Sequence, residues 1–94
     1  RASTCHIAPT DQGMRIEARV TLPYTGGREV AVIETGTPDL WISEAHTTRQ
    51  GDTLVAVSDM VHPRGGAFGI DRSAVRITIL GGSYGVDVRG CAAQ

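Results

Sequence analysis

The sequence contains no lysine and very few aromatic residues. All nine basic residues are arginine, and they face ten acidic residues, so the formal net charge is −1. A balance so close to neutral argues against a nucleic-acid-binding protein and against binding to an anionic membrane surface. With one Trp, two Tyr and one Phe, the core must be filled by Val, Ile, Leu and Ala, which suits thin strands packed in two layers.

Long apolar runs are also missing. No stretch approaches the about 20 residues that a transmembrane helix needs, so we expect no insertion into a membrane. The 94 residues predict a single domain that covers positions 1–94. A chain this short buries only about 60–65% of its unfolded surface, so a covalent cross-link would add much to its stability.

Only two cysteines are present, Cys5 and Cys91, one near each end of the chain. They lie too far apart for a redox Cys-x-x-Cys pair or a zinc ribbon, and we predict that they form one disulfide. Closing a loop of about 85 residues would stabilise the protein by roughly 4–5 kcal/mol. Such a bond persists in an oxidising compartment, which predicts a periplasmic or extracellular location. The alternative is two unrelated buried thiols in a cytosolic protein.

The first residue, Arg1, is not a methionine. A chain that begins in this way is typical of an exported protein whose signal peptide has been removed. This agrees with the periplasmic location that the disulfide predicts.

Patterns that carry chemistry are absent. The three histidines are far apart in the sequence and have no local partner of the kind that zinc or copper sites show, so we expect no metal and no cofactor. No glycine pair precedes a helix, as a phosphate-binding loop requires. No Gly-x-Ser-x-Gly motif occurs, and both cysteines are assigned to the disulfide. We therefore predict no catalytic residue and no enzymatic activity. The histidines are His6, His46 and His62.

Apolar and polar residues alternate along several short segments, whereas helical periodicity hardly occurs. The clearest strand covers residues 14–22, where apolar side chains alternate with charged ones. About seven short strands, separated by turn signals about every 8–12 residues, are typical of an immunoglobulin-like β-sandwich. We place Val20, Ile77 and Ile79 in its core. The expected strands cover residues 5–8, 14–22, 28–34, 40–45, 53–57, 74–80 and 84–91.

Five arginines are expected to point outward from these strands. An open sheet face that carries arginine could hold an unfolded polar chain by many weak contacts, since the guanidinium makes several directed hydrogen bonds at once. The alternative is an ordinary soluble surface with Asp and Glu interspersed. The five are Arg15, Arg19, Arg28, Arg76 and Arg89.

Trp41 is the single tryptophan of the chain. A flat exposed indole could stack on a sugar, but the pattern favours a core position in the middle of a sheet. Within segment 40–45, either Trp41 or the pair Leu40 and Ile42 faces inward.

Four segments follow one another in a distinctive order. Residues 16–22 (IEARVTL) are followed by 28–32 (REVAV), and residues 48–54 (TRQGDTL) contain a Thr-basic-Gln-x-x-Thr-Leu pattern. Residues 74–79 (AVRITI) lead through Gly-Ser-Tyr at 82–84 into a return strand. This order resembles the CsgC/CsgH-like curli assembly proteins.

The resemblance, which spans positions 13–90, implies an immunoglobulin-like periplasmic protein. Members of that family keep curli amyloid subunits from polymerising before export, without ATP and at low stoichiometry, and their recognition is partly electrostatic. One branch carries a Cys-x-Cys motif where this chain has Thr25-Gly26-Gly27, so a thiol-redox role does not transfer. The presence of the Cys5–Cys91 pair instead resembles the CsgH branch of the family.

The resemblance and the outward arginines together predict a monomeric, non-catalytic binding protein. Its partner would be an unfolded curli-type amyloid subunit, whose polymerisation it would inhibit by transient electrostatic contacts through the five arginines. The alternative is a non-catalytic envelope module, structural or carbohydrate-binding, that uses Trp41 as its contact.

Overall fold

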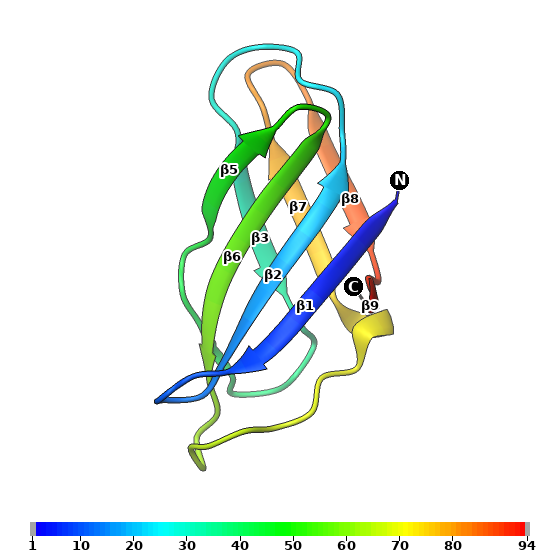
Figure 1. The fold of residues 1–94 in the computed structure, drawn as a ribbon. Coiled ribbons are helices and arrows are strands. Elements are labelled where there is room, and N and C mark those ends of the chain that lie inside the picture. The colour runs from blue at the N-terminus through cyan, green and yellow to red at the C-terminus, as the bar shows by residue number, and fades with distance from the viewer. Residues whose placement is uncertain (1, 94) are drawn as a thin grey trace.

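The computed structural model describes residues 2–93, and its strands form two sheets that pack face to face (Figure 1). In chain order the elements are β1 (Ser3–Pro9), β2 (Met14–Thr21), β3 (Val30–Glu34), β4 (Trp41–Ile42), β5 (His46–Gln50), β6 (Thr53–Val61), the short 3-10 helix η1 (Arg72–Ala74), β7 (Arg76–Leu80), β8 (Gly85–Arg89) and β9 (Ala92–Ala93). No helix in the described part of the chain is long and apolar enough to cross a membrane.

The larger sheet has the strand order β4-β6-β2-β1-β9, with β5 also paired to β6, and the smaller sheet has the order β3-β7-β8. Figure 1 shows the larger sheet in front of the smaller one. Every pairing is antiparallel except that of β1 with β9. Cys5 in β1 is bonded to Cys91, which directly precedes β9. The predicted two-layer sandwich and its terminal disulfide are therefore confirmed.

The core lies between the two sheets and is built by strand alternation. Every second residue of β2, from Met14 to Val20, is buried, and Ile77 and Ile79 of β7 face them from the smaller sheet. Val20, Ile77 and Ile79 are each at most 1% exposed, so the predicted core positions are confirmed. Burying one such aliphatic side chain stabilises the fold by about 1.5–3 kcal/mol.

The strands along β6 differ from those that the sequence predicts. The expected strand at 40–45 is only the two-residue β4, and the unpredicted β5 pairs with the first half of β6. Between them Ser43 holds the chain to β6, because its backbone N–H donates to Asp59 O and its Oγ accepts from Asp59 N. Strand β5 has no large aliphatic side chain, so its sequence shows no apolar alternation.

Trp41 does not lie in the core, so the favoured interpretation of this residue was wrong. Its side chain is exposed on the outer surface of the larger sheet, while Leu40 and Ile42 pack against the core. The register explains this: Ile42 pairs with the fully buried Met60, and alternation then turns Trp41, opposite Val61, to the outside.

Candidate functional site

The structure distributes the five predicted arginines over separate surfaces. Arg15 and Arg19 lie on the outer face of the larger sheet, in β2. Arg76 in β7 and Arg89 in β8 are exposed and directly opposite each other on the outer face of the smaller sheet. Arg28 is exposed in the loop before β3. The five therefore do not form one continuous surface.

The two arginines of the larger sheet are neutralised by carboxylates on the same face. Arg15 Nε lies 2.8 Å from Asp59 Oδ1 on the neighbouring strand β6, and this hydrogen bond raises the pKa of Arg15. Arg19 Nε lies 3.4 Å from Glu17 Oε2, and its Nη1 donates to Gln50 Oε1 at 3.4 Å. This face consequently has no surplus of positive charge along β2.

Arg76 and Arg89 of the smaller sheet share one aspartate. Arg76 Nε donates to Asp87 Oδ1 at 2.8 Å, and Arg89 Nε lies 3.9 Å from Asp87 Oδ2. The hydrogen bond from Arg76 is the main reason that the pKa of Asp87 is lowered. The Arg89 side chain is 74% exposed. Its contact with Asp87 is long, so its guanidinium can bind a partner.

Exposed aliphatic side chains cover the other end of this face. Val30, Val32 and Leu80 are 37%, 46% and 50% exposed, and Val30 lies directly opposite Leu80 in the sheet. Val32 is two residues further along β3 and therefore shares their side of the sheet. Contiguous exposed apolar groups of this kind mark interaction surfaces. We call Val30, Val32, Leu80, Arg76 and Arg89 together the β3–β7–β8 face.

The aliphatic part of this face was not predicted, although the sequence held the signal. Ala31 and Ile33 are buried, and strict alternation along β3 then turns Val30 and Val32 outward. Within the described strands, β3 and β8 each pair with β7 alone. The face thus belongs to a three-stranded sheet, and within residues 2–93 its outer strands β3 and β8 have no second strand partner.

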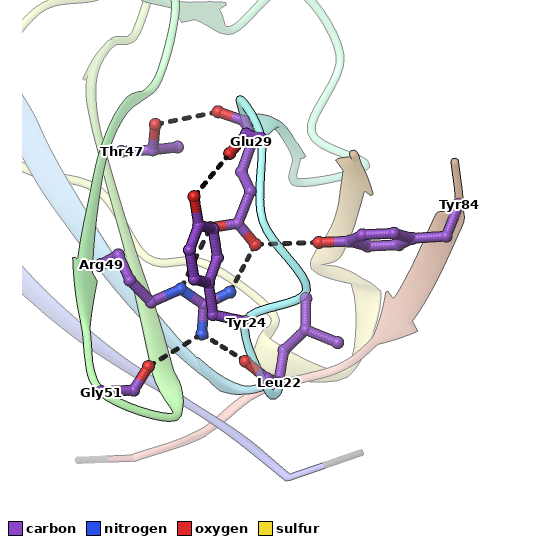
Figure 2. Close-up of polar contacts among 8 residues, drawn as sticks. Leu22, Tyr24, Glu29, Thr47, Arg49, Gly51 and Tyr84 are labelled. Carbon is purple, nitrogen blue, oxygen red and sulfur yellow. Dashed lines mark hydrogen bonds and ion pairs between the residues drawn. The ribbon is translucent and has the colours of Figure 1, made fainter. Parts of the chain in front are cut away.

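A buried ion pair connects the two sheets at one end of the sandwich (Figure 2). Arg49 of β5 donates through Nε to Glu29 Oε1 at 3.0 Å and through Nη2 to Glu29 Oε2. Tyr84 O–H donates to Glu29 Oε2 at 2.8 Å. The side chains of Glu29 and Arg49 are only 5% and 18% exposed. Because Glu29 precedes β3, its contact with Arg49 ties the larger sheet to the β3 side of the smaller one. Tyr84, which precedes β8, donates to the same carboxylate.

Further contacts satisfy the remaining polar groups of the pair. Arg49 Nη1 donates to the backbone oxygens of Leu22 and Gly51, and its guanidinium lies 5.3 Å from the centre of the Tyr24 ring. The hydrogen bond from Arg49 lowers the pKa of Glu29, and that carboxylate raises the pKa values of Arg49 and Tyr84. A carboxylate held ionised in this way stabilises the fold and is poorly suited to proton transfer.

In the sequence, Arg49 stands out only as the basic residue of the Thr-basic-Gln-x-x-Thr-Leu pattern. Alternation in β5 turns Thr47 and Arg49 inward, and Thr47 Oγ1 donates to Glu29 O at 3.2 Å. An inward-facing arginine contradicts the usual burial preference. No signal in the sequence distinguished it from the outward arginines.

The histidines lie apart in the structure. His6 and His46 are exposed on different strands, and the ring of His62 packs 5.4 Å from that of Phe68. Among residues 2–93, no group of three or more His, Cys, Asp or Glu side chains could hold a metal ion.

Comparison with known proteins adds no relative. A scan against models of protein families, a search of curated proteins and a search of solved structures each found no match to this chain. The two-sheet architecture consequently rests on the strand pairing described above. The resemblance to the CsgC/CsgH-like proteins rests on the sequence segments alone.

Proposed function

We propose that this protein is a periplasmic, chaperone-like inhibitor of curli-type amyloid polymerisation. It binds the unfolded subunit through the β3–β7–β8 face. The observation that carries this proposal is the arrangement of three exposed aliphatic side chains and two arginines on one open sheet. The segments that resemble CsgC/CsgH-like proteins support a curli-type subunit as the client. The disulfide supports an oxidising compartment.

Binding on this face is weak and short-lived. The aliphatic end, around Val32 and Leu80, takes up apolar side chains of the extended client. Arg89 and Arg76 donate hydrogen bonds to its carboxylates and side-chain amides. Because Arg76 already pairs with Asp87, a client group must compete for this guanidinium. Such contacts lower the population of encounters that can nucleate a fibril without trapping a stable complex.

The inhibitor must not itself act as a template for fibril growth. Strand β1 ends at Pro9, and proline blocks further strand pairing because it lacks an N–H group. The outer edge strand β5 carries only polar side chains. These features disfavour edge-to-edge aggregation of the larger sheet.

Fibril growth of a curli-type subunit, followed by thioflavin fluorescence, tests the proposal. Substoichiometric protein should lengthen the lag and should have less effect on elongation from preformed seeds. The delay should shrink as salt rises, because exposed charges are screened beyond roughly 8–10 Å at physiological ionic strength. An unchanged lag at equimolar protein would refute the amyloid function.

Matched variants identify the face. Val32→Ser and Arg89→Glu should each shorten the delay, since both residues lie exposed on the β3–β7–β8 face. Arg19→Glu, on the outer face of the larger sheet, should leave the delay unchanged. If Arg19→Glu alone shortens the delay, the client binds the larger sheet instead.

A further inference from the structure

An open hollow of about 330 Å³ lies beside Trp41, and none of its lining residues belongs to the β3–β7–β8 face. It is lined by the 10–13 turn, β2, β4 and the end of β6. Trp41 is 58% exposed, the largest exposed fraction among the exposed large hydrophobic residues described. Keeping a tryptophan in water forgoes the stabilisation that its burial would give.

The backbone that carries Trp41 is nevertheless well fixed. Trp41 pairs with Val61 in the sheet. Two residues later, Ser43 N donates to Asp59 O at 2.9 Å, and Ser43 Oγ accepts from Asp59 N at 2.8 Å. The indole is therefore presented from an ordered strand, as a rigid apolar surface should be.

Polar groups lie next to the indole on the same outer face. Arg15 and Asp59 are opposite each other on β2 and β6, and both line the hollow. Their contact uses Arg15 Nε and Asp59 Oδ1. Within residues 2–93, the terminal guanidinium nitrogens of Arg15 and Oδ2 of Asp59 make no further hydrogen bond, so donors and acceptors remain for a ligand.

A closed turn forms the opposite rim. Thr10 N donates to Gly13 O at 2.9 Å, and Gly13 N donates to Thr10 Oγ1 at 3.1 Å. A Cβ atom on Gly13 would lie 2.2 Å from Met60 O, so only glycine lets the turn approach β6 this closely. The turn holds Asp11 and Gln12, both exposed, at the edge of the hollow.

We propose that the Trp41 hollow binds a neutral oligosaccharide of gluco configuration. The C–H face of a pyranose ring with equatorial hydroxyls matches the flat indole, and the vicinal hydroxyls match the fork of Arg15 and the carboxylate of Asp59. The Arg15–Asp59 pair is neutral and Asp11 adds a negative charge, which disfavours anionic sugars. This site is independent of the amyloid function, and either can hold without the other.

Fluorescence of the single tryptophan reports directly on the hollow. Titration with cellohexaose should shift the Trp41 emission in a saturable way. In NMR spectra of backbone amides, the shifts should centre on residues 10–12, 41 and 59–61. By calorimetry, Trp41→Ala and Arg15→Gln should each weaken binding at least about tenfold. Arg28→Gln, an exposed change in the loop before β3, should leave the affinity unchanged.

Several results would overturn the proposal. The first is the absence of a saturable emission shift up to about 10 mM cellohexaose. The second is an affinity for cellohexaose that stays unchanged in Trp41→Ala or Arg15→Gln. Tighter binding of heparin than of cellohexaose would show an anion site. Shifts at the hollow that only a curli-type subunit produces would show a protein-binding surface. Because Trp41 and Arg15 are both exposed, at least one variant should fold, which the amide spectrum verifies.

Discussion

At Arg49, alternation along β5 turns a guanidinium toward the space between the sheets, where an aliphatic side chain is usual. Burial of a charge is costly unless the charge is paired and hydrogen-bonded. Here the carboxylate of Glu29 and the backbone oxygens of Leu22 and Gly51 accept the hydrogen bonds. The stability of this region therefore depends on both partners being present.

This pairing makes a prediction for acid stability. Arg49 lowers the pKa of Glu29 below its ordinary value of 4.5, and Tyr84 acts in the same direction. Stability from such a carboxyl is fully present above the ordinary pKa and is lost as the pH falls through the lowered one. In Arg49→Met, we expect the free energy of unfolding at neutral pH to be about 3–5 kcal/mol lower. The loss of stability as the pH falls should also become shallower, or stability should rise instead. Urea denaturation between about pH 7 and pH 3 measures both effects.

Arg19→Met is the matched control for this experiment. Its ion pair with Glu17 is longer and more exposed, so its loss should cost less than about 1 kcal/mol. The dependence of its stability on pH should stay the same as that of the unmodified protein. Equal slopes in Arg49→Met and the unmodified protein would show that Arg49 does not control the ionisation of Glu29.

At the scale of the element, the sequence predicts a strand well only where large apolar residues alternate. Strands β2 and β7 were predicted because apolar residues recur on one face of each strand, such as Ile16 and Val20 in β2 and Ile77 in β7. Strand β5 was missed because its backbone is held by pairing with β6 and its sequence has no apolar repeat. In β4, two residues are too few for alternation to decide which way Trp41 points.

The candidate site was predictable in part for the same reason. Alternation correctly turned Arg15, Arg19, Arg76 and Arg89 outward, because that depends on neighbouring residues alone. Which sheet each strand joins depends on the whole topology, so their separation onto two faces was not predictable. Strand register also decides which carboxylates neutralise the arginines. Asp59 pairs with Arg15 across the sheet, and Asp87 lies near Arg76 in the β7–β8 hairpin.

Strand β7 provides a test of facing within one element. Ile77 is fully buried, whereas its neighbour Thr78 points to the outer side of the smaller sheet. Ile77→Ala should lower the free energy of unfolding by about 2–5 kcal/mol, because it removes core contacts and leaves a cavity. Thr78→Ala should cost less than about 1 kcal/mol. Chemical denaturation of both variants decides the matter, and equal losses would mean that the strand faces are reversed.

For the whole molecule, the two sheets are joined along both sides by different chemistry. On the side of β1 and β8, the Cys5–Cys91 bond is accompanied by hydrogen bonds from Arg72 Nη1 to Cys5 O at 2.6 Å and from Ser3 Oγ to Gly90 O at 2.8 Å. The other side is joined by the contact of Arg49 with Glu29. The smaller sheet, which carries the proposed client-binding face, is thus fixed at both edges.

Removing the disulfide should therefore open the sandwich from one side. The cysteines are 86 positions apart. Loop-closure arithmetic for that length predicts that Cys5→Ala/Cys91→Ala loses roughly 4–5 kcal/mol, much of the stability of a domain this small. Urea denaturation measures the loss, and mass spectrometry of the non-reduced protein should show two hydrogens fewer than the dithiol form. Amide hydrogen exchange in the variant should speed up first in β1 and β9, while β5 and β6, held by Arg49 and Glu29, stay protected. Uniform acceleration across all strands would mean that the two sides do not open separately.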